Sequence, residues 1–129
     1  MEPSHDEFRE AAALRGALRK FLRQSEQIAR EEGLTPSRYS LLLMIKASDE
    51  GRSTVTELSE QMQLTQSTVT ELVTRAEVTG LVQREQSTDD ARVSWLRLTP
   101  DAEERLARAV ARNGRERERL LQLISSVAP

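Results

Sequence analysis

The feature that most constrains the fold is a pair of short amphipathic helical patterns directly before an alternating strand pattern. Thr54 and Glu57 have the spacing of a helix-capping box, with Glu57 able to reach back to the N–H of Thr54, and Thr65 precedes a second helical pattern that ends at Gly80. Apolar residues recur at three- and four-residue steps in both patterns, which predicts one buried face on each helix. Two short helices joined by a tight turn are typical of a helix-turn-helix.

Strand character follows at once. Residues 81–85 predict a short strand, and residues 92–98 alternate between apolar and polar side chains after turn residues at 87–90. A β-hairpin directly after a helix-turn-helix is a wing. We therefore predict a mainly α fold with a small β-hairpin, a winged helix-turn-helix over residues 34–98.

A buried helix is predicted before the helix-turn-helix. Thr35 and Pro36 have the order of a cap followed by proline at the first helical position, and residues 39–45 are almost entirely apolar. Residues 49–53 are polar and contain a glycine, which indicates a loop.

Long helical patterns flank this unit on both sides. Residues 6–32 carry an apolar stripe, and so do residues 100–126. The second stripe weakens at 113–117, which allows a bend or break of the helix there. We expect these two helices to form a dimerisation region, because a monomer would leave their stripes exposed. The whole chain, 1–129, is predicted to be a single domain.

Composition excludes several classes of protein. The chain has no Cys, which excludes disulfides, thiolate catalysis and Cys-based zinc sites. Its single His, His5, falls in an end that is expected to fray, so we predict neither a His-based metal site nor a Ser-His-Asp triad within one chain. Carboxylates lie at helix salt-bridge spacings and no Gly-rich phosphate loop occurs, so we predict no enzyme, no metal and no other cofactor. The polar N-terminus and the absence of a long apolar run predict a cytoplasmic protein without a membrane span. With a net charge of −2, DNA binding would depend on local positive groups.

Four short motifs mark the helix-turn-helix and the wing. They are LTQSTVT at 64–70, GLV at 80–82, DDAR at 89–92 and LTP at 98–100. In this order, and over about residues 8–127, the chain resembles the MarR family of winged-helix transcription regulators.

This resemblance implies a homodimeric repressor that reads a pseudo-palindromic operator in double-stranded DNA. The helix at 65–79 would enter the major groove and the wing at 82–98 the minor groove. Two positions depart from the family pattern, since Glu71 stands where a basic residue is common and Thr74 where Asp is common. The family's last C-terminal helix is predicted to be absent, which leaves only the first and last helices for the dimer.

The exposed face of the 65–79 helix carries side chains that match base edges. Gln can pair with adenine, Ser and Thr reach most edges, and Glu accepts from cytosine N4, although a solvated helix face is the alternative.

On the wing, Arg92 is expected to enter the minor groove with Asp90 holding its guanidinium, the alternative being a weak surface pair. Arg75 and Arg84 either contact phosphate or brace the wing through Glu77 or Asp89. Helix starts favour phosphates, but the polar residues there also serve as plain caps. The candidate DNA-binding residues are Ser37, Arg38, Thr54, Gln66, Ser67, Thr68, Thr70, Glu71, Thr74, Arg75, Arg84, Asp90 and Arg92.

An effector is the second partner that the resemblance implies, as a small aromatic or anionic molecule in a crevice between the dimer helices and the DNA-binding part. Arg15, Arg19, Arg38, Tyr39 and Met44 are its candidate lining, although Tyr39 and Met44 are more typical of a core. Two other functions stay open: a winged helix that binds proteins, and a ligand-binding protein that does not bind DNA. The salt dependence of duplex binding separates them.

Overall fold

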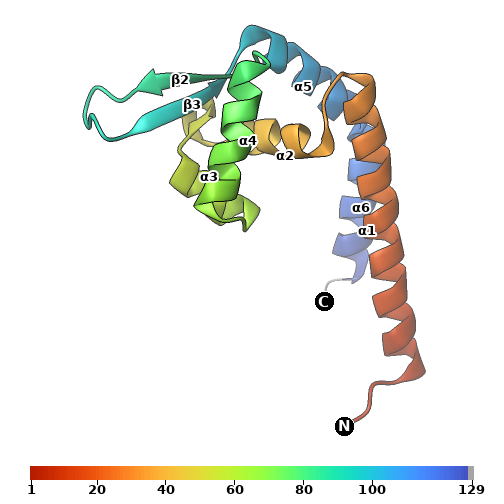
Figure 1. Ribbon diagram of the computed structural model, residues 1–129. Coiled ribbons are helices and arrows are strands. Elements are labelled where there is room, and N and C mark those ends of the chain that lie inside the picture. Colours follow the sequence, from red (N-terminus) through yellow and green to blue (C-terminus); the bar gives the residue numbers. More distant parts are fainter. Residues whose placement is uncertain (128–129) are drawn as a thin grey trace.

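The computed structural model describes residues 1–127. They form a body, an arm and a helix that joins them, α5 (Figure 1). The arm is formed by the first and last helices, which lie side by side, and the body contains the helix-turn-helix and the sheet. In chain order the elements are α1 (His5–Glu31), α2 (Pro36–Ala47), the 3₁₀ turn η1 (Asp49–Gly51), β1 (Arg52–Ser53), α3 (Val55–Met62), α4 (Gln66–Val78), β2 (Val82–Gln86), β3 (Ser94–Leu98), α5 (Pro100–Arg112) and α6 (Gly114–Val127). None of the described helices is long and apolar enough to cross a bilayer.

Threonine caps begin the helices of the body and the joining helix. The hydroxyls of Thr35, Thr54, Thr65 and Thr99 each accept a backbone N–H from three residues further on, at 3.2 to 3.3 Å. The predicted capping box at Thr54 is only half formed. Its Glu57 carboxylate accepts from the hydroxyl of Ser53 at 3.1 Å instead of the N–H of Thr54.

The core lies inside the body. Its largest fully buried apolar side chains come from the turn before α2 and from α2, α3, α4 and β3. They are Leu34, Leu41, Leu42, Ile45, Leu58, Val69, Val73 and Leu96. Gly80, at φ 76°, ends α4 as predicted, and the next N–H, of Leu81, bonds to the carbonyl of Ala76 at 2.8 Å. This turn directs the chain from the buried face of α4 into the sheet.

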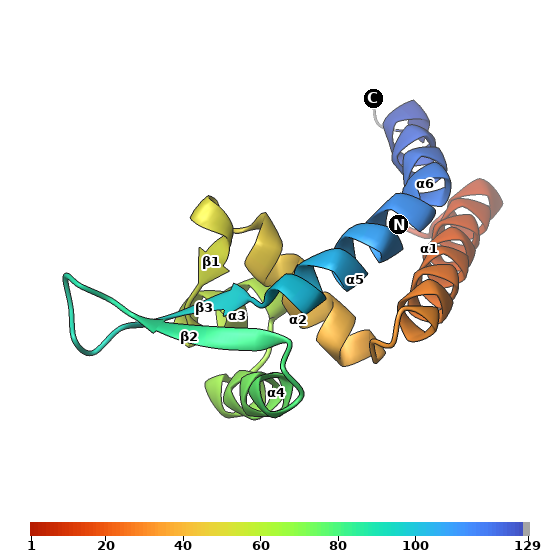
Figure 2. The same cartoon turned by 90° about the horizontal axis from the view of Figure 1, so that it is seen from above.

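The sheet has three antiparallel strands in the order β1-β3-β2. The hairpin of β2 and β3 is the predicted wing, and it projects away from the arm (Figure 2). Residues 49–53, predicted as a loop, instead form η1 and β1, with Arg52 paired to Arg97 and Ser53 to Leu96. A two-residue strand is too short to carry an alternating pattern, so the sequence alone does not indicate it.

The helix predicted over 100–126 is divided at Asn113 into α5 and α6, which is the bend or break that was considered at 113–117. The division falls within the 113–117 segment where the apolar stripe weakens. Asn113 and Gly114 are both poor residues for a helix interior, which accounts for the break. The second of these helices, α6, lies, apart from its last residue, within the range that was predicted for one helix.

Candidate nucleic-acid interface

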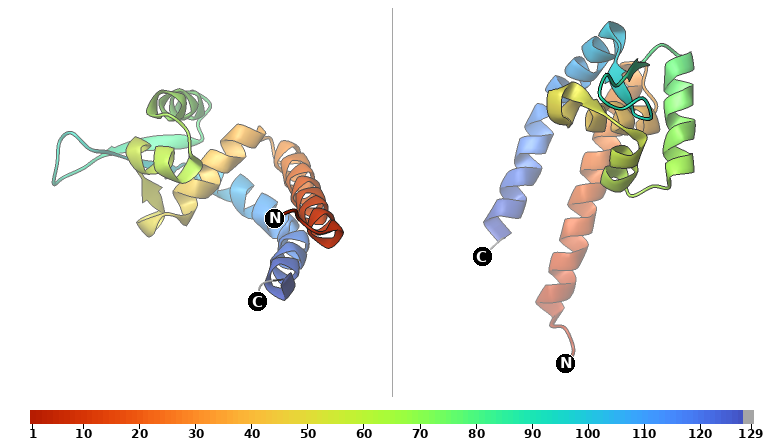
Figure 3. Two further views of the ribbon diagram at one scale, coloured as in Figure 1. Left: turned by 90° about the horizontal axis from the view of Figure 1, so that it is seen from below. Right: turned by 90° about the vertical axis from the view of Figure 1, so that its left-hand side faces the viewer.

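Helix α4 presents a polar surface at the outside of the body. Val69, Val73 and Ala76 are buried against the core, which leaves the rest of the helix facing solvent. In Figure 3 this helix lies on the opposite side of the body from α6. The structure brings the predicted α4 residues together as exposed side chains: Gln66, Ser67, Thr68, Thr70, Glu71, Thr74 and Arg75.

Several of these side chains bond within the helix. Arg75 pairs with Glu71, one turn away, at 2.6 Å, and not with Glu77 or Asp89 as considered from the sequence. The hydroxyl of Thr74 donates to the carbonyl of Thr70 at 2.9 Å. Because the Glu71–Arg75 pair is exposed, it contributes little to stability. It does place the positive charge of Arg75 beside the negative charge of Glu71, where the family pattern has a basic residue.

Arg84 braces the wing, which is one of the two roles considered for it. From β2 its Nε donates to the carboxylate of Glu77 on α4 at 2.9 Å. At the same end of α4, the hydroxyl of Thr99 donates to the carbonyl of Gly80 at 2.7 Å. These contacts join α4 and the base of the wing.

The tip of the wing presents an arginine to solvent. The Arg92 side chain is 91% exposed, and Asp90 Oδ1 accepts from both its backbone N–H, at 3.0 Å, and its Nε, at 3.3 Å. The hydroxyl of Ser87 accepts the N–H groups of Asp89 and Asp90, each at 3.2 Å, which shapes the turn before the arginine. Ser87 was missed as a supporting residue, although a serine at the start of a turn is a recognisable signal.

The base of the wing has a second set of contacts that sequence reasoning missed. Arg97 on β3 donates to the Glu85 carboxylate at 2.6 Å and to the carbonyl of Glu50 at 2.9 Å. The hydrogen bond from Arg97 lowers the pKa of Glu85. Arg52 lies 4.2 Å from the centroid of the Trp95 ring, a cation–π contact. These residues hold the sheet to η1.

The candidates at helix starts, Ser37, Arg38 and Thr54, differ in burial and hydrogen bonding. The Thr54 hydroxyl acts as the cap of α3, which is the structural role considered for it. Ser37 is exposed and Arg38 is half-buried, both in the first turn of α2. Their positions leave the first turn of α2 accessible from solvent.

A hollow of about 520 Å³ lies between the arm, α2 and the α5–α6 junction. Of the predicted effector residues, Tyr39 and Met44 line it, together with Phe21, Asn113 and Arg117. Burial raises the pKa of Tyr39, and the positive charge of Arg117 opposes that rise. The buried Asn113 Oδ1 has no hydrogen-bond partner among the described residues, so it offers a free acceptor.

The remaining predicted effector residues are not brought to this hollow. Arg15 and Arg19 line a separate hollow along α1, with Leu18 and Leu22, and Arg38 is not among the described residues that line either one. Asn113 and Arg117 were missed because the weakened stripe at 113–117 indicated a bend or break but not which side chains it would bring to this hollow.

Comparison with known proteins decides the family. The family model for the MarR family matches residues 32–93, from the end of α1 to the tip of the wing. The winged-helix part of this chain, over residues 32–93, belongs to the MarR family. Comparison with curated proteins gives no significant match.

Solved structures extend the MarR fold over the arm as well. The transcriptional regulator Tm0710 from Thermotoga maritima is 27% identical, with a TM-score of 0.68 and coverage of 92% of this chain and 80% of that one. AbsC, a MarR family transcriptional regulator from Streptomyces coelicolor, is 22% identical, with a TM-score of 0.78 and coverage of 100% and 86%. Sco3205, a MarR family transcriptional regulator from the same organism in complex with DNA, is 22% identical, with a TM-score of 0.74 and coverage of 100% and 80%.

Proposed function

We propose that this MarR-family protein is a homodimeric transcriptional repressor that binds a pseudo-palindromic operator in double-stranded DNA. The observation that carries the proposal is the almost fully exposed Arg92 at the tip of a wing that is braced against an exposed polar helix. Sco3205, which has this fold, was solved with DNA and lends support.

Each α4 helix would lie in a major groove, with the two copies about one helical turn apart. Gln66 and Thr70 are exposed and suited to base edges, while the first turn of α2, with Ser37 and Arg38, is suited to phosphate. Arg92 would enter the minor groove, where negative potential is concentrated over narrow A·T-rich segments. The remaining candidates, Thr54 included, would support or flank these contacts.

A second copy of the chain would cover the arm. The first turns of α1 extend beyond the end of α6 (Figure 1), so the outer part of α1 lacks a helix beside it within the described chain. The exposed large apolar side chains of the arm are Phe8, Leu14, Leu18, Leu22, Leu121, Leu123 and Ile124. A monomer would leave this surface in water, which favours a dimer formed by α1 and α6.

The hollow beside Tyr39 would hold the effector. It combines an apolar wall with the guanidinium of Arg117 and the free acceptor Asn113 Oδ1, which suits a small aromatic anion that also carries a donor. The dimer would have two states, one whose α4 spacing fits the operator and one whose spacing does not. A ligand that binds the second state more tightly than the first would lower DNA affinity by the difference between its two binding free energies.

Arg92→Ala tests the function directly. We expect lower duplex affinity with the fold and dimer unchanged, and a salt slope that falls by about one for each Arg removed, or about two for the dimer. Arg30→Ala is the matched control, because Arg30 is exposed in the last turn of α1, outside both α4 and the wing. Titrations of a duplex selected from a random pool, at several salt concentrations, measure both quantities.

Asp90→Ala tests whether the Asp90 carboxylate holds the Arg92 guanidinium in place or only repels DNA phosphate. It should weaken binding less than Arg92→Ala, because it frees the guanidinium without removing its charge. Duplex binding by Arg92→Ala that equals the parent's at every salt concentration would refute the wing assignment. A parent that binds no duplex in a salt-dependent way would instead favour a protein-binding winged helix.

A further inference from the structure

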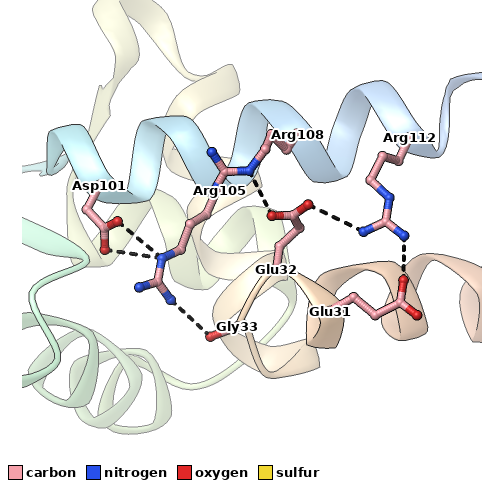
Figure 4. Close-up of polar contacts among 7 residues, drawn as sticks. All are labelled: Glu31, Glu32, Gly33, Asp101, Arg105, Arg108 and Arg112. Carbon is pink, nitrogen blue, oxygen red and sulfur yellow. Dashed lines mark hydrogen bonds and ion pairs between the residues drawn. The ribbon is translucent and has the colours of Figure 1, made fainter.

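The joint between arm and body contains a network of ion pairs (Figure 4). Glu32, directly after α1, accepts from Arg108 at 2.8 Å and from Arg112 at 3.3 Å, both on α5. Glu31 bonds to the same Arg112. We call these four residues, Glu31, Glu32, Arg108 and Arg112, the clasp. The paired residues of the clasp are 76 to 81 positions apart in the chain. The clasp therefore joins two segments that are distant in the sequence.

The next residues fix the path from α1 into α2. Gly33 has a φ of +79°, and its carbonyl accepts from Arg105 at 3.4 Å, while Arg105 also pairs with Asp101. A Cβ at position 33 would lie 2.6 Å from the Arg105 guanidinium and in a left-handed conformation that L-residues rarely adopt. The chain therefore turns from arm to body within a few residues that α5 holds on one side.

Glu32 differs from the other ion-paired carboxylates. Its side chain is only 14% exposed, against 63% for Glu71 on α4 and 41% for Glu103 on α5. A carboxylate that is shielded from water and receives two guanidinium groups is held in one geometry more firmly than an exposed single pair.

Small rotations at the clasp are magnified along the arm. Helix α1 has 27 residues, which gives a length of about 40 Å. A rotation of about 5° at the clasp would move the far end of a rod of that length by about 3.5 Å. In a dimer held together by its arms, the same rotation changes the distance between the two α4 helices.

We propose that Glu32 is a positioning residue that fixes the angle between arm and body, and through it the spacing of the two α4 helices on DNA. The part that concerns DNA rests on the proposed function. The part that concerns the angle does not, and it can be measured in the free protein.

The first experiment measures the angle. Because the chain has no Cys, spin labels at Glu10→Cys on the arm and Val78→Cys on α4 are specific, and both positions are exposed. Labelled protein diluted into unlabelled protein gives the distance within one protomer. We expect one narrow distribution in the parent and a broader or shifted one in Glu32→Gln. Glu103→Gln, which breaks the exposed pair with Lys46, is the matched control and should leave the distribution unchanged.

The second experiment measures spacing on DNA. The probes are the duplex that the parent selects from a random pool and two derivatives with one base pair added to or removed from its centre. We expect the parent to prefer the selected spacing, and Glu32→Gln to lose most of that preference. Glu103→Gln should keep it.

The outcomes separate the alternatives. An unchanged distance distribution in a folded Glu32→Gln protein would overturn the proposal, and so would equal loss of affinity at every spacing, which indicates a general structural defect. A changed distribution in a protein whose parent binds no duplex would refute the proposed function and uphold the role of Glu32 in the angle.

Discussion

The apolar side chains of the body and of the arm have opposite environments. In the body, Leu42 and Leu58 have no exposed surface, whereas in the arm Leu22 and Leu121 remain 53% and 59% exposed. The body therefore encloses its own core, while the arm has a face that only another surface can cover. The comparison teaches that the core is closed within one region while the other keeps an uncovered apolar face, with the clasp at their joint.

Leu42→Ala should have the largest effect, because it opens a cavity in the closed core of the body. We expect the free energy of unfolding to fall by about 2–5 kcal/mol. Denaturant titration followed by circular dichroism measures the loss. The loss should persist at every protein concentration, and a loss that disappears on concentration would mean that the body also depends on assembly.

Leu22→Ala should weaken assembly and leave the body folded. About half of this side chain remains to be buried, so the change should cost about 1 kcal/mol per protomer and about 2 kcal/mol per dimer, or roughly thirtyfold in Kd. Sedimentation over a range of concentrations measures it. A parent that remains a monomer at micromolar concentration would contradict the assignment of the arm to dimerisation.

The pH dependence of the clasp is the smallest effect. The hydrogen bond from Arg112 lowers the pKa of Glu31, and the hydrogen bond from Arg108 lowers that of Glu32. Since these pKa values are lower in the folded state, their contribution is complete above the unfolded value of about 4.3 and is lost as the pH falls through the folded values.

Carboxyl chemical shifts followed by nuclear magnetic resonance give these midpoints. Arg108→Gln should move the midpoint of Glu32 back toward the ordinary range and change that of Glu31 less. Equal midpoints of Glu32 in the parent and in this variant would show that Arg108 is not its main partner.

Local signals in the sequence predicted the parts of the fold that local contacts determine. Thr65 and Gly80 mark the two ends of α4 because a cap and a left-handed turn each depend on a few adjacent residues. A weakened stripe indicated a possible bend or break at 113–117, and the structure has the break between α5 and α6 at Asn113.

Contacts between distant segments could not be predicted in the same way. Glu32 and Arg108 lie 76 residues apart, and nothing in either local pattern indicates that they meet. The same holds for Arg97 and Glu50, and for the hollow that brings Tyr39 to Asn113. By contrast, the pair of Arg84 and Glu77 was among those considered, because only a short turn separates α4 from β2.

That short connection also affects how the protein would search along DNA. With Glu77 bonded to Arg84 and Gly80 to Thr99, α4 and the wing are joined at two points. If the protein binds DNA as proposed, a protomer would insert α4 and the wing together and withdraw them together. A substitution on α4 that alters base preference would accordingly leave the placement of the wing unchanged.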